Sequence, residues 1–473
     1  MIKNKIVHIA TLMVTLRLVL TVITFAAMAM FLNADGPAFA ESTAGEQPGM
    51  EGLSLERSIE TALANNRQVL MAREGMNYAD ERLNEANARK YPSLASTASY
   101  TRFDEVATVS IGPGVSGTIG DVNNSKGELS IKQPIYSGGR ISAGVESALL
   151  GKTIQSNQND DIAKRVVFLA KKAYYDVLLN EAIVEVNRKS ETLTKHHLEN
   201  IQKMAAQGLS FRYELLRVQV QLTNIRAMRI QSETNLQNVR LLFFNTIGLP
   251  LEGAESLKLT DKLSMPVGGK EVPEHSARLP LLAGLPAGLE DAFHNRSDLK
   301  IAQLRIDMQR QSIVLAESEG KPAFNLMWNF GYEYPSRKEF LTQGWGDYWN
   351  IVAVASVPVF EWGRIKARIR QEESLLKQAE IAEMDIRERI KLEVRQSVSS
   401  VQDSVVLIET QNENIKQAEE GLRLAEIGYK NGVNTQLEVM DTQMALDTAS
   451  KNYVQSLYQY NLAKANLDLV TGK

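Results

Sequence analysis

Two long tracts of the chain place apolar residues three or four positions apart, which is the spacing of one face of a helix. The first tract includes Ile162, Val166, Leu169, Ala173 and Val177, and the second includes Ile390, Val394, Val398, Val401, Val405 and Ile408. Neither 135–249 nor 359–473 contains a proline. We therefore predict helices across 139–247 and 363–470, and shorter helical stretches at 54–90 and 289–320.

Each long tract is interrupted once by a short run that contains glycine. The two runs are Gly208–Leu209–Ser210 and Gly432–Val433–Asn434. Such runs predict tight helix–helix turns, so each tract would be a helical hairpin. The arm 139–206 would be about 100 Å long and the return arm 211–247 about 55 Å. The stretches 54–90 or 288–320 could supply the missing ~45 Å by stacking end to end on a return arm.

Between the helical tracts the period of the pattern changes to two. In "AFNLMWNFGYEY" (323–334) aromatic and aliphatic residues share one face, and Asn325, Asn329 and Glu333 share the other. This alternation predicts a strand that is long enough to cross a membrane. We predict a partner strand at 347–360 and more polar counterparts at about 93–103 and 127–136.

The four tryptophans of the chain fall in or beside the second predicted hairpin. Aromatic girdles at membrane interfaces place tryptophan in this way. A soluble hairpin whose aromatic residues pack on the helices is the alternative. The apolar character of one whole face argues against it.

An internal repeat accounts for the order of these elements. "QPIYSGGRISAG" (133–144) and "SVPVFEWGRIKAR" (356–368) match at an interval of 224 residues, and 61–72 resembles 291–302 at an interval of 230. A gene duplication is the simplest source of such a long repeat. We divide the chain into a first repeat at 41–248, an irregular proline-rich linker at 249–288 and a second repeat at 289–473.

Residues 1–40 have the pattern of an export signal. Lys3, Lys5 and Arg17 precede an apolar run, and Ala38–Phe39–Ala40 has the small residues of a cleavage site. The apolar run is shorter than the ~20 residues of a membrane span, which favours a cleaved signal over an anchor. The rest of the chain has no apolar run of that length, so the exported protein is periplasmic, secreted or an outer-membrane barrel.

Four strands are too few for a barrel, and an open sheet edge cannot lie in lipid. A membrane-inserted sheet therefore requires several copies of the chain. Two copies would give eight strands and three would give twelve. The residues by themselves leave this choice open.

The chain resembles the TolC-like outer-membrane efflux proteins, the outer-membrane factors of tripartite efflux pumps and type I secretion systems. The likeness covers about 53–473 and rests on "LSLERSIETALANN", "QPIYSGGR", "VPVFEWGR" and "YKNGVNTQLEVMDTQ". It implies a homotrimer in which a twelve-stranded membrane β-barrel continues into a long α-helical barrel across the periplasm. The implied partners are outer-membrane lipid, a periplasmic adaptor (membrane fusion protein) and an inner-membrane transporter of the RND, ABC or MFS type.

The resemblance also implies roles for particular residues. The two repeated corners would form the barrel–tube junction, and their residues are Pro134, Gly139, Arg140, Pro358, Gly363 and Arg364. Ordinary surface arginines are the alternative for Arg140 and Arg364. The two helix–helix turns would be the tips that contact the adaptor.

Tyr429, Glu438 and Asp441 match the periplasmic gate of the family. Glu438 and Asp441 lie at i and i+3 on one side of the predicted helix. Around a threefold axis they would form a carboxylate ring that attracts cations. Asn434 stands where relatives can carry arginine, so the network of contacts that holds the gate closed would be weaker or different here. Two exposed acids on a surface helix are the alternative.

Signals for catalysis are weak. The chain has no cysteine, which excludes disulfides and thiol chemistry. His196 and His197 are adjacent rather than four residues apart, so we expect a solvated pair and no metal site. "GPGVSG" (112–117) fits a dinucleotide-binding pattern but is followed by turn residues instead of a helix.

The formal net charge of −3 gives no sign of nucleic-acid binding. We therefore predict a non-enzymatic exit duct in the outer membrane that needs no cofactor. A periplasmic coiled-coil structural or adaptor protein is the alternative.

Overall fold

The computed structural model describes residues 51–473, except 113–114, 119, 209–210, 264–284 and 339–343. The expected signal at 1–40 lies outside these residues, as do Leu209 and Ser210. Within the described residues, no helix is both long and apolar enough to span a bilayer.

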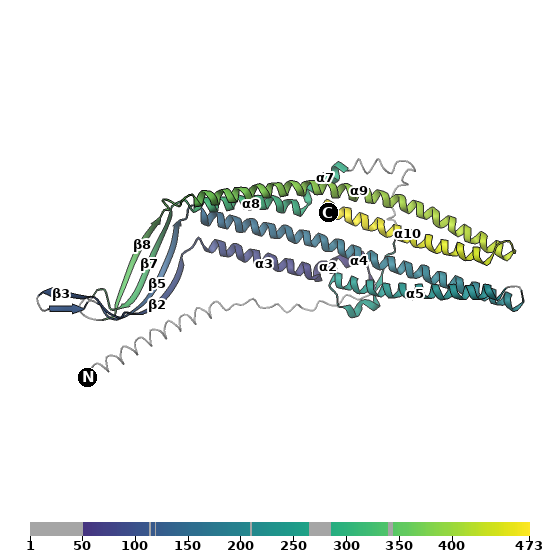
Figure 1. The fold of residues 1–473 in the computed structure, drawn as a ribbon, viewed down its shortest axis with the longest axis horizontal. Coiled ribbons are helices and arrows are strands. Elements are labelled where there is room, and N and C mark those ends of the chain that lie inside the picture. The colour runs from purple at the N-terminus through teal and green to yellow at the C-terminus, as the bar shows by residue number, and fades with distance from the viewer. Residues whose placement is uncertain (1–50, 113–114, 119, 209–210, 264–284, 339–343) are drawn as a thin grey trace, which may run out of the picture. The chain divides into compact units, whose positions relative to one another are not determined.

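Two helical hairpins supply most of the structure (Figure 1). Helix α4 (Arg140–Ala206) packs on α5 (Arg212–Ile247), and α9 (Arg364–Lys430) packs on α10 (Gln436–Thr471). Both α4 and α9 contain 67 residues, which corresponds to about 100 Å. Equal lengths in both halves agree with the interval of 224 residues in the sequence.

Two helices occupy each shorter stretch, where the sequence pattern indicated one. These are α2 (Leu55–Asn65) and α3 (Arg67–Ala88) in the first half, and α7 (Leu285–Asn295) and α8 (Ser297–Ser318) in the second. The first break occurs at Asn66, whose extended backbone lets its side chain accept a hydrogen bond from the Gln68 amide. Asn66 thereby caps α3, and Arg296 holds the second break in a similar backbone conformation.

The ends of the return helices lie at these breaks. Gly248, which follows α5, is so close to α2 that a Cβ atom there would lie 2.4 Å from the Asn65 carbonyl oxygen. A Cβ atom at Gly472, which follows α10, would lie 2.9 Å from Asn295 Cβ. The end of α5 thus lies at the break between α2 and α3, and the end of α10 lies at the break between α7 and α8 (Figure 1). The lengths of the helical tracts predicted such end-to-end stacking.

A four-stranded antiparallel sheet precedes the long helices. Its strands are β2 (Ser93–Arg102), β5 (Asn123–Tyr136), β7 (Ala323–Tyr334) and β8 (Gly346–Ser356), and their order is β2-β5-β7-β8. Strand β5 begins four residues earlier than the predicted 127–136. Strand β8 ends at Ser356, four residues before the predicted end at 360.

Other strands had no counterpart in the predictions. Strands β3 (Thr108–Gly112) and β4 (Val115–Thr118) form a separate antiparallel pair that includes most of "GPGVSG". A strand, not a helix, therefore follows the glycines. Strand β1 (Glu51–Leu53) pairs in parallel with β6 (Lys258–Leu259), and with the 3-10 helix η1 (Leu251–Ser256) it gives order to part of the linker that was expected to be irregular.

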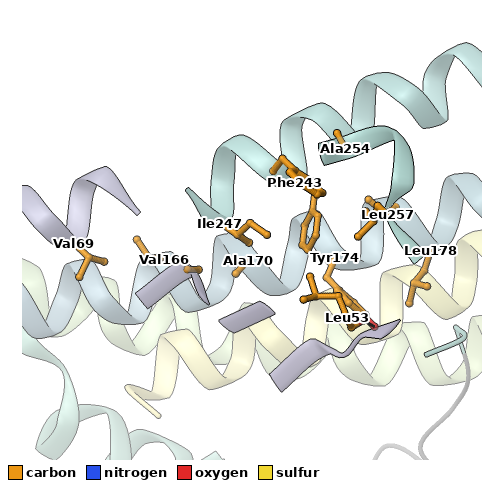
Figure 2. Packing of buried hydrophobic residues seen from close by; sticks show 13 residues of the cluster. Leu53, Val69, Val166, Ala170, Tyr174, Leu178, Phe243, Ile247, Ala254 and Leu257 are labelled. Carbon is orange, nitrogen blue, oxygen red and sulfur yellow. Dashed lines mark hydrogen bonds between the residues drawn. The ribbon is translucent and has the colours of Figure 1, made fainter. Parts of the chain in front are cut away.

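The largest buried cluster surrounds Tyr174 of α4, in the first half (Figure 2). Phe243 and Ile247 of α5 and Leu53 of β1 pack around it, and the Tyr174 hydroxyl donates to Asp261 at 2.7 Å. A second cluster in the other half includes Ile390, Val394 and Val398, at positions matching Val166, Ala170 and Tyr174. The repeat thus keeps the positions of the core and changes the side chains.

Candidate functional site

The two corners between strand and helix have the same backbone conformation. Gly138 and Gly139 have φ angles of 65° and 94°, and Trp362 and Gly363 have φ angles of 48° and 81°. Two successive left-handed residues turn the chain into α4 and α9. Glycine adopts this conformation without steric cost, whereas Trp362 does not. The sequence indicated the role of Gly139 and Gly363 but not that of the residue before each.

The surroundings of the two corners differ. A Cβ atom at Gly138 would lie 2.7 Å from Lys321 Cβ and 3.1 Å from the Ser318 carbonyl oxygen, at the end of α8. Trp362, at the matching position, is 90% exposed, and its ring meets Phe360 edge-on at 4.9 Å. The first corner is therefore closed by packing within the chain, and the second is open.

Arg140 and Arg364, the arginines expected at the barrel–tube junction, also differ. Arg364 forms ion pairs with Glu361 and Glu319, whereas Ser137 and Arg89 occupy the corresponding positions around Arg140. Pro134 lies beside a register irregularity near the end of β5, and Pro358 follows the end of β8. The residues expected at the junction thus lie at two corners that share a backbone conformation but differ in the charged side chains around the arginine.

The helical tips end α4 and α9 in the same way. Gly208 and Gly432 both have a φ of 72°, and each donates its N–H to the carbonyl three residues earlier. At the second tip the Val433 amide also donates to the Gly428 carbonyl at 2.8 Å, which completes a Schellman motif. Asn434 packs so close to Gly428 that a Cβ atom at Gly428 would lie 2.6 Å from its side chain.

The helices that leave the tips begin differently. Thr435 and Glu438 form a capping box, in which the Thr435 amide donates to Glu438 Oε2 at 2.6 Å and the Glu438 amide donates to Thr435 Oγ1 at 3.3 Å. Phe211 is the N-cap residue of α5, and its side chain makes no capping hydrogen bond. The T-x-x-E spacing of Thr435 and Glu438 is a usable signal for this helix cap, which was not among the predictions from the sequence.

The three residues matched to the gate fall into two places. Glu438 and Asp441 are both exposed on α10. Tyr429 is partly buried between helices, in contact with the cluster of Leu422, Ala425 and Val439. Burial, and secondarily the nearby carboxylate of Glu214, raise the pKa of Tyr429, so its phenol remains protonated.

A cleft of about 590 Å³ lies beside Tyr429, between α4, α5, α9 and α10. His197 lines it, with Nε2 2.7 Å from Gln436 Oε1 and its ring against Tyr429. His197 is therefore partly buried in a contact between the two hairpins, while His196 is exposed as expected. Farther along the same contact, Ser190 donates to the carboxylate of Asp447 at 2.5 Å. No sequence motif singled out these pairs, because they join helices about 240 residues apart.

In strand β7 the apolar side chains are exposed and the polar side chains are buried, which is the reverse of the arrangement in a soluble protein. The β7 residues Phe324, Leu326, Trp328, Phe330 and Tyr332 are exposed, whereas Asn329 and Glu333 of the other face are buried. Asn329 and Asn350 form a hydrogen bond between β7 and β8 on that polar face. An exposed apolar face of this kind suits contact with lipid.

A membrane-facing antiparallel sheet continued by long helical hairpins defines a class of outer-membrane channel proteins. The model of the outer membrane efflux protein family matches residues 58–242 and 288–473, and the chain belongs to this family. This confirms the resemblance drawn from the motifs.

Two named relatives are similar to the chain in sequence, and one solved structure is similar to it in fold. The probable efflux pump outer membrane protein TtgC of Pseudomonas putida is 22% identical over 420 residues, covering 88% of this chain and 82% of the relative. Outer membrane protein TolC of Vibrio cholerae is 22% identical over 310 residues, covering 65% of this chain and 67% of the relative. The crystal structure of VceC, also from Vibrio cholerae, superposes with a TM-score of 0.72 at 18% identity, covering 88% of this chain and 96% of that one.

The chain is accordingly an outer-membrane protein that provides the exit channel of an efflux system. The prediction of its location and general function is confirmed. The alternative of a periplasmic structural or adaptor protein is not favoured.

Proposed function

We propose that three copies of the chain form the duct, with twelve strands in one membrane barrel and the helical hairpins in one periplasmic tube. The sheet order supports a closed ring of copies, because both β2 and β8 are edge strands of a four-stranded sheet whose apolar face is exposed. The number three is the one that the family resemblance implies. Lipid cannot hydrogen-bond to the free edges, so neighbouring copies must pair with them. Transport through such a tube is passive.

The gate of this duct would lie at the helical tips. Asp441 and Glu438 share one exposed side of α10, which is the arrangement that a ring of carboxylates around a threefold axis requires. Tyr429 would hold the closed state through its packing between the hairpins. Opening would then separate the tips, as contact with an adaptor favours the open state.

The tips would also contact the periplasmic adaptor, which links the duct to a transporter of the RND, ABC or MFS type. Phe211 and Val433 are 80% and 79% exposed at the two tips. Exposed apolar residues at the end of a hairpin support a protein-binding role. The left-handed Gly208 and Gly432 keep both turns narrow enough for helical ends to approach.

Ion conductance in a planar bilayer tests the gate, and the capping box dictates the variants. Glu438→Gln removes the charge but keeps a side chain that can complete the cap, whereas Glu438→Ala removes both. We expect small cation-selective currents from the native protein, and larger, less selective currents from the Glu438→Gln/Asp441→Asn double variant.

Unchanged selectivity and conductance in the double variant would exclude these carboxylates as the constriction and leave the channel intact. An effect of Glu438→Ala that Glu438→Gln does not reproduce would assign Glu438 to helix capping alone. Folded, inserted protein that never conducts would contradict the duct itself.

A further inference from the structure

The two strand hairpins of the chain have equivalent registers. Ser93 pairs with Lys132 in the first, and Ala323 pairs with Ser356 in the second. The β2 and β7 residues are 230 apart and the β5 and β8 residues are 224 apart, which are the two intervals of the sequence repeat. Adding the repeat intervals to the residue numbers of a strand pair in the first hairpin therefore gives the pair that is observed in the second hairpin.

The chain also contains one junction between its halves, where β5 pairs with β7. In this junction Ser130 lies opposite Asn329, and Leu129 opposite Phe330. If copies form a ring, the edge strand β8 meets β2 of the next copy, and the repeat makes this junction equivalent to β5–β7. The β8 residue that matches a β5 residue is 224 positions later, and the β2 residue that matches a β7 residue is 230 positions earlier. The pair Ser130–Asn329 therefore corresponds to Val354–Ser99, and the pair Leu129–Phe330 corresponds to Ala353–Tyr100.

The strand directions and the side-chain faces are both consistent with this register. All neighbouring strands of the sheet are antiparallel, so β8 and the next β2 also run antiparallel, as the hairpin-like junction requires. The faces agree as well, because Ala353 lies on the face of the exposed Trp349 and Ile351, and Tyr100 is itself exposed on the matching face of β2. A slip of one residue would place each side chain opposite one from the other face.

The same conversion applies to the corners. Within the chain, Gly138 lies against Lys321 and Ser318, and the Tyr136 and Phe324 rings are 6.1 Å apart. The matching positions at the junction between copies are Trp362 against Tyr91 and Ala88, and Phe360 against Leu94. Phe360, Trp362, Tyr91 and Leu94 are all strongly exposed in the single chain.

We propose that the second corner is an aromatic clamp between copies, in which Trp362 and Phe360 of one copy pack on Tyr91 and Leu94 of the next, with β8 and β2 paired so that Val354 lies opposite Ser99. This inference rests on the proposed ring of chains and specifies its register. The corner between copies must be wider than the first corner, where a Cβ atom would lie 2.7 Å from Lys321 Cβ, because Trp362 needs room for its own Cβ and ring. The clamp would cover the Trp362 ring, which is 90% exposed in the single chain.

Disulfide cross-linking tests the register cleanly, because the natural chain has no cysteine. Opposite residues of antiparallel strands have Cα atoms about 4.5–5.5 Å apart, within the range of a disulfide. We expect Val354→Cys/Ser99→Cys in the full-length protein to give dimers and trimers that are resistant to SDS and revert to monomers on reduction. The control Val354→Cys/Thr101→Cys is shifted by two residues on the same face and should cross-link at least several-fold less.

Two outcomes overturn the register while leaving the ring intact. One is a trimer by light scattering in which Val354→Cys/Ser99→Cys does not cross-link, and the other is preferential cross-linking of the shifted pair. A folded protein that light scattering finds monomeric in detergent and in bilayers would overturn the proposed ring as well. The two failures are thus distinguishable.

A double-mutant cycle tests the clamp. Trp362→Gly keeps the left-handed backbone unstrained and removes the ring, and Tyr91→Ala removes its proposed partner. Both single variants should lower the temperature at which the trimer dissociates in SDS, and the double variant should lower it by less than the sum. Additive effects would overturn the clamp. Trp349→Ala, paired with Tyr91→Ala, is the control, because Trp349 lies on the exposed face of β8 away from the corner and should behave additively.

Discussion

In the first half of the chain the corner between strand and helix is packed, and in the second half the equivalent corner is open. Gly138 touches the end of α8, while Trp362 is exposed beside Phe360. The backbone angles are nevertheless alike. The difference teaches that the duplication kept the path of the chain while each half adapted its side chains to a different neighbour.

The helical tips show the same contrast in hydrogen bonds. A left-handed glycine ends α4 and α9 alike, but only the helix that follows the second tip begins with a side-chain cap. Phe211 occupies the position of Thr435, and Glu214 occupies the position of Glu438. The start of α10 is therefore fixed more firmly than the start of α5.

The largest expected effect comes from filling the packed corner. Gly138→Ala adds a left-handed penalty of about 1–2 kcal/mol to an overpacking cost of about 1–3 kcal/mol against Lys321 and the Ser318 carbonyl. We expect a loss of roughly 2–5 kcal/mol in the free energy of unfolding. Denaturation in detergent, followed by circular dichroism at 222 nm, measures it.

Gly208→Ala is the matched control for this change. Gly208 has a similar left-handed backbone, but no atom of the described part of the chain beyond its direct neighbours lies within 4 Å of the Cβ position. It should therefore lose only the conformational part, roughly 1–2 kcal/mol. Equal losses in the two variants would show that packing at the first corner contributes little.

A smaller effect is expected from exchanging the caps of the two tips. Thr435→Ala should destabilise the first turn of α10 by about 1 kcal/mol, because it removes an N-cap. Phe211→Thr should stabilise the first turn of α5 by a similar amount, because Glu214 stands where a capping box requires it. Hydrogen exchange of the amides in these first turns reports each change separately.

Phe211→Val is the control, since it shortens the side chain without supplying a cap. If exchange at α5 slows equally in Phe211→Val and Phe211→Thr, the contrast between the tips is not a matter of capping.

The smallest expected effect concerns pH. Burial raises the pKa of Asp447, which accepts hydrogen bonds from Ser190 and Gln443, with Lys451 nearby. The folded state holds this proton at pH values where the unfolded state has lost it, so the contribution of Asp447 to stability falls as pH rises through its folded pKa. Thr223 occupies the matching position in the first half, where no such dependence can arise.

Asp447→Asn should therefore flatten the fall in stability as pH rises from about 4, the ordinary pKa of an aspartate, towards neutral. Thermal unfolding across this range measures the slope. Thr223→Asn, which changes the matching position of the first half and involves no titratable group, should leave the slope unchanged. An unaltered slope in Asp447→Asn would mean that this carboxyl group is not the source.

The sequence revealed most of the long elements, because their patterns are local. The apolar spacing through Val166 and Val394 marked the long helices, and the alternation at 323–334 marked β7. It failed at Asn66 and Arg296, where one residue of extended backbone divides a helix without disturbing the apolar spacing on either side. It also missed β1 and β6, since strands of two or three residues are stabilised by pairing and leave little pattern of their own.

The candidate site was predictable where the repeat marked it and unpredictable where it depends on contacts between halves. Gly139, Gly363, Gly208 and Gly432 stood out because a backbone that needs glycine recurs at the same interval. His197 with Gln436 and Ser190 with Asp447 did not, because neither residue of a pair indicates the presence of the other.

By itself, the sequence determined the family, the duplication, the helical hairpins and the glycine turns, because each depends on local periodicity or on a motif written twice. Only the tertiary structure decided that β5 joins β7, that Glu438 caps α10, that His197 enters the cleft, and that one corner is packed while the other is open. Those features depend on which distant segments become neighbours. Packing and hydrogen bonding between segments remote in sequence determine that choice.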